Sequence, residues 1–87
     1  MLESREFQRI REQVVAELEK TTKKPVEVTD DTHIVRDLEI DSLAVMNLTL
    51  ALEDEFDISM PLERVAEVET VHDLIATVAE LIEERAS

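Results

Sequence analysis

Apolar residues recur at helical spacing in three separate stretches of the chain. The first stretch predicts a helix from about Ser4, its N-terminal cap, to about Lys20. The second predicts a helix from about Ser42 to Phe56, and the third predicts a helix that follows Thr70. The apolar positions of the first helix are Phe7, Ile10, Val14, Val15 and Leu18, and those of the last are Val71, Leu74, Ile75, Val78, Leu81 and Ile82. Each stripe indicates a helix with one face in a shared core.

Two connections join these helices. The segment from Thr21 to about Leu38 opens with Thr-Thr-Lys-Lys-Pro, which ends a helix, and it predicts a long first loop. Pro61 suits the first turn of a short helix, which we predict from Leu62 to about Val68. The chain after Ile82 is expected to be a charged, frayed end. The pattern therefore predicts an all-α fold of three longer helices and one short helix, in a single domain over residues 1–87.

The second helix is apolar on two sides. Its core face is predicted to hold Val45, Leu48, Leu52 and Phe56. The opposite side carries Leu43, Met46 and Leu50, with Asn47 between them and the acidic residues Glu53 and Asp54 at the border. Scattered exposed apolar residues are common on protein surfaces. The shared spacing of these three residues favours a docking strip for a basic partner protein.

The charge of the chain restricts its partners. The net charge is −13, with 7 basic and 11 acidic residues in positions 1–41 (−4) and 2 basic and 11 acidic residues in positions 42–87 (−9). Such acidity excludes direct nucleic-acid binding and disfavours anionic membranes, so protein partners should be basic. Cysteine is absent and no apolar run approaches bilayer length, so we expect a cytoplasmic protein without membrane insertion. The charge also favours a monomer.

No catalytic constellation is evident in the sequence. His33 and His72 stand alone, and no base is predicted beside Ser42. A phosphate-binding loop and a metal cluster are both missing, and the turn Thr29–Thr32 lacks the glycine and closing glutamate of a calcium loop. We therefore expect a protein that is not an enzyme.

The one position with evident chemistry is Ser42. Asp41 is a good N-cap for the helix that follows, because its carboxylate can accept the free backbone N–H groups of the first turn. Ser42 then occupies the first helical position, with its hydroxyl at the positive end of the helix dipole. A negative group attached to this hydroxyl would be stabilised there.

Three segments together resemble the acyl carrier protein family. They are Asp37-Leu38-x-x-Asp41-Ser42-Leu43, then Ala51-Leu52-Glu53-Asp54-Glu55-Phe56-Asp57-Ile58-x-x-Pro61, then Thr70-Val71-x-Asp73-Leu74. The resemblance implies a four-helix bundle with 4′-phosphopantetheine attached to Ser42, next to Asp41. It implies a phosphopantetheinyl transferase as one partner. It also implies partners that load, condense or transfer acyl groups in fatty-acid, lipid or polyketide-type biosynthesis.

The resemblance also implies a pocket for the acyl chain between the helices. Six residues match lining positions of that pocket: Val45, Leu48, Met60, Val65, Val68 and Leu74. The alternative is an ordinary packed core, and the sequence does not separate the two.

Three positions depart from the family's pattern. Glu39 stands where the family usually has glycine, so the loop before Ser42 is expected to be shaped differently. Ala44 and Asn47 stand where acidic recognition residues are usual, which weakens steering to a generic basic surface. We therefore expect a specialised, free-standing carrier with dedicated enzymes. An aminoacyl or peptidyl carrier and a non-carrier acidic helical adaptor remain as alternatives.

Overall fold

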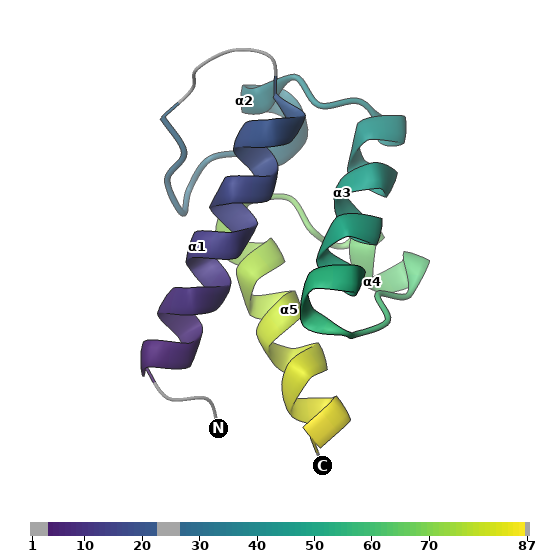
Figure 1. Ribbon diagram of the computed structural model, residues 1–87. Coiled ribbons are helices and arrows are strands. Elements are labelled where there is room, and N and C mark those ends of the chain that lie inside the picture. The colour runs from purple at the N-terminus through teal and green to yellow at the C-terminus, as the bar shows by residue number, and fades with distance from the viewer. Residues whose placement is uncertain (1–3, 23–26, 87) are drawn as a thin grey trace.

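The computed structural model describes residues 4–22 and 27–86, which form an all-helical bundle (Figure 1). The three long helices are α1 (Ser4–Thr21), α3 (Ser42–Phe56) and α5 (Val71–Ala86). Two short helices, α2 (Ile34–Leu38) and α4 (Leu62–Ala66), lie in the connections between them. The predicted all-α arrangement of three longer helices and one short helix is confirmed, and α2 is an addition to it.

The helix bounds differ from the prediction mainly at two ends. Helix α4 stops at Ala66 instead of Val68, because the N–H groups of Glu67 and Val68 close tighter turns onto the carbonyls of Arg64 and Val65. The end that we expected to fray is helical as far as Ala86. Arg85 in this last turn forms an exposed ion pair of 3.1 Å with Asp57.

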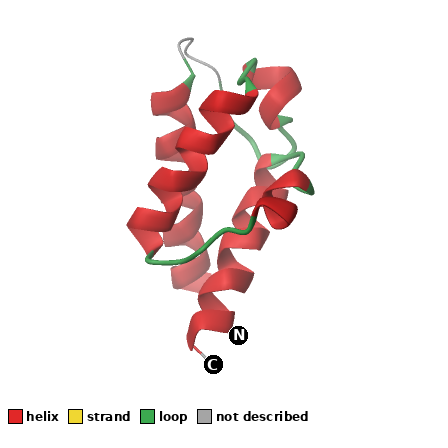
Figure 2. Ribbon diagram, turned by 90° about the vertical axis from the view of Figure 1, so that its right-hand side faces the viewer, coloured by secondary structure: helices red, strands yellow, loops and turns green. Residues whose placement is uncertain are grey.

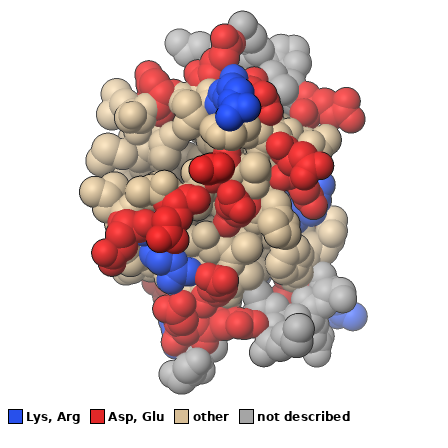
Figure 3. Space-filling model, turned by 180° about the vertical axis from the view of Figure 1, so that it is seen from behind, with Lys and Arg blue, Asp and Glu red and all other residues tan. Residues whose placement is uncertain are grey.

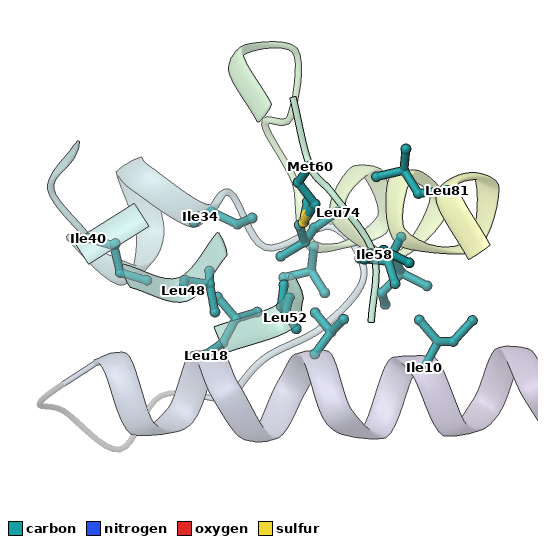
Figure 4. Close-up of a cluster of buried hydrophobic side chains, with 14 of the residues drawn as sticks. Ile10, Leu18, Ile34, Ile40, Leu48, Leu52, Ile58, Met60, Leu74 and Leu81 are labelled. Carbon is teal, nitrogen blue, oxygen red and sulfur yellow. The ribbon is translucent and has the colours of Figure 1, made fainter. Parts of the chain in front are cut away.

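The core lies between the three long helices. Helix α1 packs against both α3 and α5, and it contributes Ile10, Val14 and Leu18 at intervals of four residues (Figure 4). Helix α3 contributes Leu48 and Leu52. The remaining buried apolar residues are Ile34, Leu38, Ile40, Ile58, Met60, Val71, Leu74, Ile75, Val78 and Leu81. The helical stripes that the sequence predicted therefore meet in one core, except that Phe7 is exposed and Val15 is only half-buried at the edge of the first stripe.

The described part of the long first connection is held against the start of α5. The N–H of Val71 donates to the carbonyl of Thr32 at 2.9 Å, and the N–H of Ile34 donates to the carbonyl of Glu69 at 2.9 Å. Between these bonds, His33 and Thr70 form an isolated antiparallel bridge. The side chain of His33 then caps α2 by accepting the N–H of Arg36. These bonds fix α2 beside the start of α5.

The loop between α3 and α4 leaves the end of α3 and brings α4 to one side of the molecule (Figure 2). Glu53 closes this loop, because its carboxylate accepts the N–H of Met60 at 2.8 Å. None of the helices described combines the length and the apolar character that crossing a bilayer requires.

Candidate functional site

The start of α3 presents Ser42 to solvent. Asp41 precedes it in an extended conformation and caps the helix, with one carboxylate oxygen accepting the N–H of Ala44 at 2.8 Å. The N–H of Val45 donates to the carbonyl of Asp41 at 2.9 Å and closes the first turn. The backbone N–H groups of a first turn have no acceptor inside the helix. Ser42 is exposed and is the first residue of α3, so an anionic group attached to its hydroxyl would lie at the positive end of the helix dipole.

The turn before Ser42 is built on Glu39, the residue that stands in place of the family's usual glycine. Glu39 adopts the left-handed conformation that glycine favours, with φ 53° and ψ 39°, as the C-cap of α2. Ile40 then enters the core, and Asp41 begins the cap of α3. Glu39 therefore holds a backbone conformation that a glycine would adopt without strain.

A cleft of about 490 Å³ opens beside Ser42. Its wall comes from α2, the start and middle of α3, α4 and the first turns of α5. Most of the lining is apolar, and the polar exceptions are Asp41, Ser42 and Thr49. The apolar lining residues are Ile34, Val35, Ile40, Val45, Met46, Leu48, Leu62, Val65, Ala66, Val68 and Leu74. The hydroxyl-bearing residue thus lies on the rim of an apolar space.

Five of the six residues that the sequence suggested for an acyl pocket line this cleft: Val45, Leu48, Val65, Val68 and Leu74. The exception is Met60, which is buried in the core between the long helices. Sequence reasoning missed the contribution of α2, Ile34 and Val35, because it treated that segment as loop. It also missed Leu62, whose exposure only the fold reveals.

The outer side of α3 carries the apolar strip that the sequence indicated. Leu43, Met46 and Leu50 are 69%, 57% and 61% exposed. Leu62 of α4 and Val35 of α2 are also exposed and line the same cleft as Met46. We name these five residues the apolar rim.

Polar residues near the rim divide into two groups. Asn47 and Asp54 are exposed, as a role in partner recognition requires. Glu53, which we also assigned to recognition, is half-buried, and its carboxylate is bound to the N–H of Met60. Its evident role is to hold the loop between α3 and α4. The first turn of α3 carries no acidic residue.

Other chemistry finds little support in the described residues. They hold no group of three or more histidine, cysteine, aspartate or glutamate side chains placed to bind a metal ion. His33 serves as a helix cap, and His72 is exposed in the first turn of α5. The pKa of Asp73 is lowered, first by the backbone N–H of Thr70 and then by that of Glu69, which marks a structural cap.

Comparison with known proteins identifies the family. Residues 9–78 match the family model described as "Phosphopantetheine attachment site". A probable acyl carrier protein from Caulobacter vibrioides is 52% identical over 62 residues, which cover 71% of this chain and 72% of that protein. An acyl carrier protein from Rhodococcus erythropolis is 38% identical over 80 residues, covering 86% of this chain and 88% of that one.

The fold agrees with this relationship. The solved structure of a putative acyl carrier protein from Mycobacterium tuberculosis superposes with a TM-score of 0.77 at 31% identity, and covers 82% of this chain and 96% of that one. The matched family segment includes the whole of α3, with its exposed serine, and every wall of the cleft. The chain belongs to the acyl carrier protein family, whose members are carriers without catalysis of their own and hold their cargo on a 4′-phosphopantetheine group.

Proposed function

We propose that Ser42 is the residue that carries the 4′-phosphopantetheine arm, and that the arm holds an acyl group as a thioester. The observation that carries this proposal is the position of Ser42, which is exposed at the first residue of α3 and also lines the apolar cleft. The phosphodiester is anionic, and the N-terminal end of α3 offers it free backbone N–H groups and the positive end of the helix dipole. Asp41 holds the start of this helix.

Intact mass spectrometry tests the attachment site. The chain is incubated with coenzyme A and a broad-specificity phosphopantetheinyl transferase, alongside Ser42→Ala and the control Ser59→Ala. Ser59 is an exposed serine in the loop after α3, so it controls for modification of any accessible hydroxyl. We expect one phosphopantetheine on the native chain and on Ser59→Ala, and none on Ser42→Ala. A folded native chain that gains nothing with several transferases would support the acidic adaptor instead.

We further propose that the cargo is an acyl chain that lies in the cleft. The support is the lining, in which Val45, Val65, Val68 and Leu74 present hydrocarbon to the space beside Ser42. Removing a hydrocarbon tail from water is favourable by about 0.8 kcal/mol for each buried CH₂ group. An aminoacyl cargo would place a charged ammonium group against the same lining, at a cost. Loading assays with acyl-transferring and amino-acid-activating enzymes distinguish the two cargoes.

The rim supports a specialised pathway with dedicated enzymes in lipid or polyketide-type biosynthesis. Its five side chains are apolar, and Ala44 and Asn47 leave the start of α3 without the acidic residues usual in the family. Partner binding at this end therefore relies on apolar contact more than on charge.

Asn47→Glu tests whether the missing acidic residues set the choice of partner enzymes. Asn47 is exposed on α3, and the change restores one acidic side chain there. Housekeeping ketosynthase and malonyl-transfer enzymes should turn over the native carrier poorly and Asn47→Glu several-fold better. Gln8→Glu, an equal change of charge on the exposed side of α1, is the control and should have no effect. Equal turnover of the native chain and a housekeeping carrier would contradict the specialised role.

The remaining proposals concern the state of the protein. We propose that the 87 residues act as one carrier domain and as a cytoplasmic monomer. The support is the single core shared by the long helices and a net charge of −13, which opposes self-association. Sedimentation velocity at physiological salt measures the oligomeric state, and a dimer would contradict this proposal.

A further inference from the structure

Helix α4 is the least anchored wall of the cleft. It has five residues, none of them buried, and its N-cap Pro61 offers no side-chain hydrogen bond. Leu62 is 76% exposed, so the apolar contact of α4 with the molecule depends mainly on the half-buried Val65. A helix this short has no stability of its own in water. Its position must therefore come from the contacts that hold it to the rest of the protein.

Arg64 supplies such contacts from the middle of α4. Its guanidinium binds the Glu80 carboxylate of α5 at 2.5 Å and the Glu84 carboxylate at 3.4 Å. The Arg64 side chain is only 27% exposed. Arginine suits this place because its planar group carries several N–H donors in a fixed fork. The two contacts join α4 to α5, which is anchored in the core by Val78 and Leu81.

The arrangement on α5 makes Arg64 hard to replace. Glu80 and Glu84 are one helical turn apart, and like charges at that spacing repel each other. Arg64 relieves this repulsion while it holds α4. Only two basic residues occur in positions 42–87, and the other, Arg85, pairs with Asp57 at the end of α3.

We propose that Arg64 is a positioning residue that latches α4 over the cleft and thereby sets how well the cargo is sheltered from water. Exposed ion pairs contribute little to the stability of a whole domain. Helix α4 is different, because its opening costs little and a modest interaction shifts the balance between its closed and open positions. The part of this proposal that concerns cargo rests on the function proposed for Ser42.

The first experiment follows amide hydrogen exchange in the unmodified protein. Arg64→Gln should raise the exchange rates of the amides of residues 65–68 at least three-fold, while amides of α1 and α3 keep theirs. Arg64→Lys keeps the positive charge but lacks the planar set of guanidinium N–H donors, so its amide exchange rates should be intermediate. Arg85→Gln removes the separate ion pair between α5 and Asp57 and should leave the exchange rates of residues 65–68 unchanged. Unchanged exchange in Arg64→Gln would overturn the latch.

The second experiment reports on the cargo. Ser42 is loaded with a phosphopantetheine arm that carries a medium-length acyl chain ending in a solvatochromic dye. In Arg64→Gln the emission should shift towards its wavelength in water, Arg64→Lys should partly restore it, and Arg85→Gln should match the native protein. An emission unaffected by Arg64→Gln would overturn the role in sheltering cargo. Failure to load Ser42 would instead count against the proposed function, and amide exchange would still decide whether the latch exists.

Discussion

Glu39 shows how a single residue shapes the approach to Ser42. The chain contains no glycine, and the two residues with positive φ in the described segments are Glu39 and Asp57. Both end a helix in the left-handed conformation that is usually given to glycine. A short polar side chain such as that of Asp57 tolerates this conformation, but a residue like Glu39 pays about 1–2 kcal/mol of strain.

Replacing Glu39 with glycine should relieve that strain. Glu39→Gly is expected to raise the free energy of unfolding by about 1 kcal/mol relative to Glu39→Ala, because alanine retains the Cβ atom and glycine does not. The alanine variant controls for loss of the carboxylate. Urea denaturation of both variants measures the difference. Equal stabilities would mean that the left-handed conformation is not strained.

Asp73 and Thr70 form a capping box at the start of α5. The N–H of Asp73 donates to the Thr70 hydroxyl at 3.1 Å, and the N–H of Thr70 donates to the Asp73 carboxylate at 3.1 Å. These backbone N–H groups favour the ionised carboxylate and hold the pKa of Asp73 below its usual value of 3.8. Folding is therefore stabilised by Asp73 above about pH 3.8, and the contribution disappears as the pH falls through the lowered pKa.

Asp73→Asn tests this dependence while it keeps an acceptor in the same place. At pH 7 the variant should be less stable by up to about 1 kcal/mol, as for other lost caps. The difference should narrow as the pH is lowered below 3.8, because Asp73 binds a proton there first in the unfolded chain and, once the pH falls below its lowered pKa, also in the folded protein. Urea titrations at several pH values measure it. A difference that stays constant down to pH 2.5 would contradict this account.

At the scale of the element, α3 combines a structural face with a binding face. Leu52 is fully buried in the core, whereas Leu50, two residues earlier, is 61% exposed. Leu52→Ala should lower the free energy of unfolding by about 2–5 kcal/mol through the cavity that it leaves.

Leu50→Ala should change the free energy of unfolding by less than about 0.5 kcal/mol and should instead reduce turnover by the partner enzyme. Thermal unfolding and carrier turnover together separate the faces. Equal turnover of Leu50→Ala and native carrier would remove Leu50 from the docking rim.

The sequence predicted the long helices well because their signals are long and local. Asp41 caps α3, and the bounds Ser42 and Phe56 agree with the structure. Helix α2 was missed because five residues are too few to display a period, and because its cap is His33, an uncommon N-cap residue.

Missing α2 had consequences for the site. Val35 was left out of the rim. Independently of α2, the resemblance matched Met60 to a pocket position, whereas Met60 is buried in the core. Glu53 shows the same limit, because its bond to the N–H of Met60 joins residues seven positions apart and has no periodic signature. The sequence therefore predicted an exposed serine at the first residue of α3, and the fold was needed to delimit the cleft beside it.

At the scale of the whole molecule, repulsion between carboxylates opposes folding. Acidic side chains dominate the charged residues on the face in Figure 3, and basic ones are few. The molecule measures 37 × 25 × 19 Å. Electrostatic interactions extend about 30 Å at 0.01 M salt and only about 8 Å at 0.15 M. At low salt each carboxylate therefore interacts with carboxylates across the whole molecule, whereas at physiological salt only near neighbours interact.

Raising the salt concentration should therefore stabilise the protein. We expect the melting temperature to rise by several degrees between 0.01 M and 0.15 M sodium chloride, since about 1 kcal/mol moves it by about 4–8 °C in a domain of this size. Millimolar magnesium or calcium should act in the same direction. Glu55→Gln removes one exposed acid from α3, so it should raise the low-salt melting temperature and flatten its salt dependence. Arg85→Gln makes the net charge more negative, so it should lower the low-salt melting temperature and steepen its dependence on salt. A melting temperature that changes neither with salt nor in these variants would show that repulsion between carboxylates does not lower the stability of the folded state.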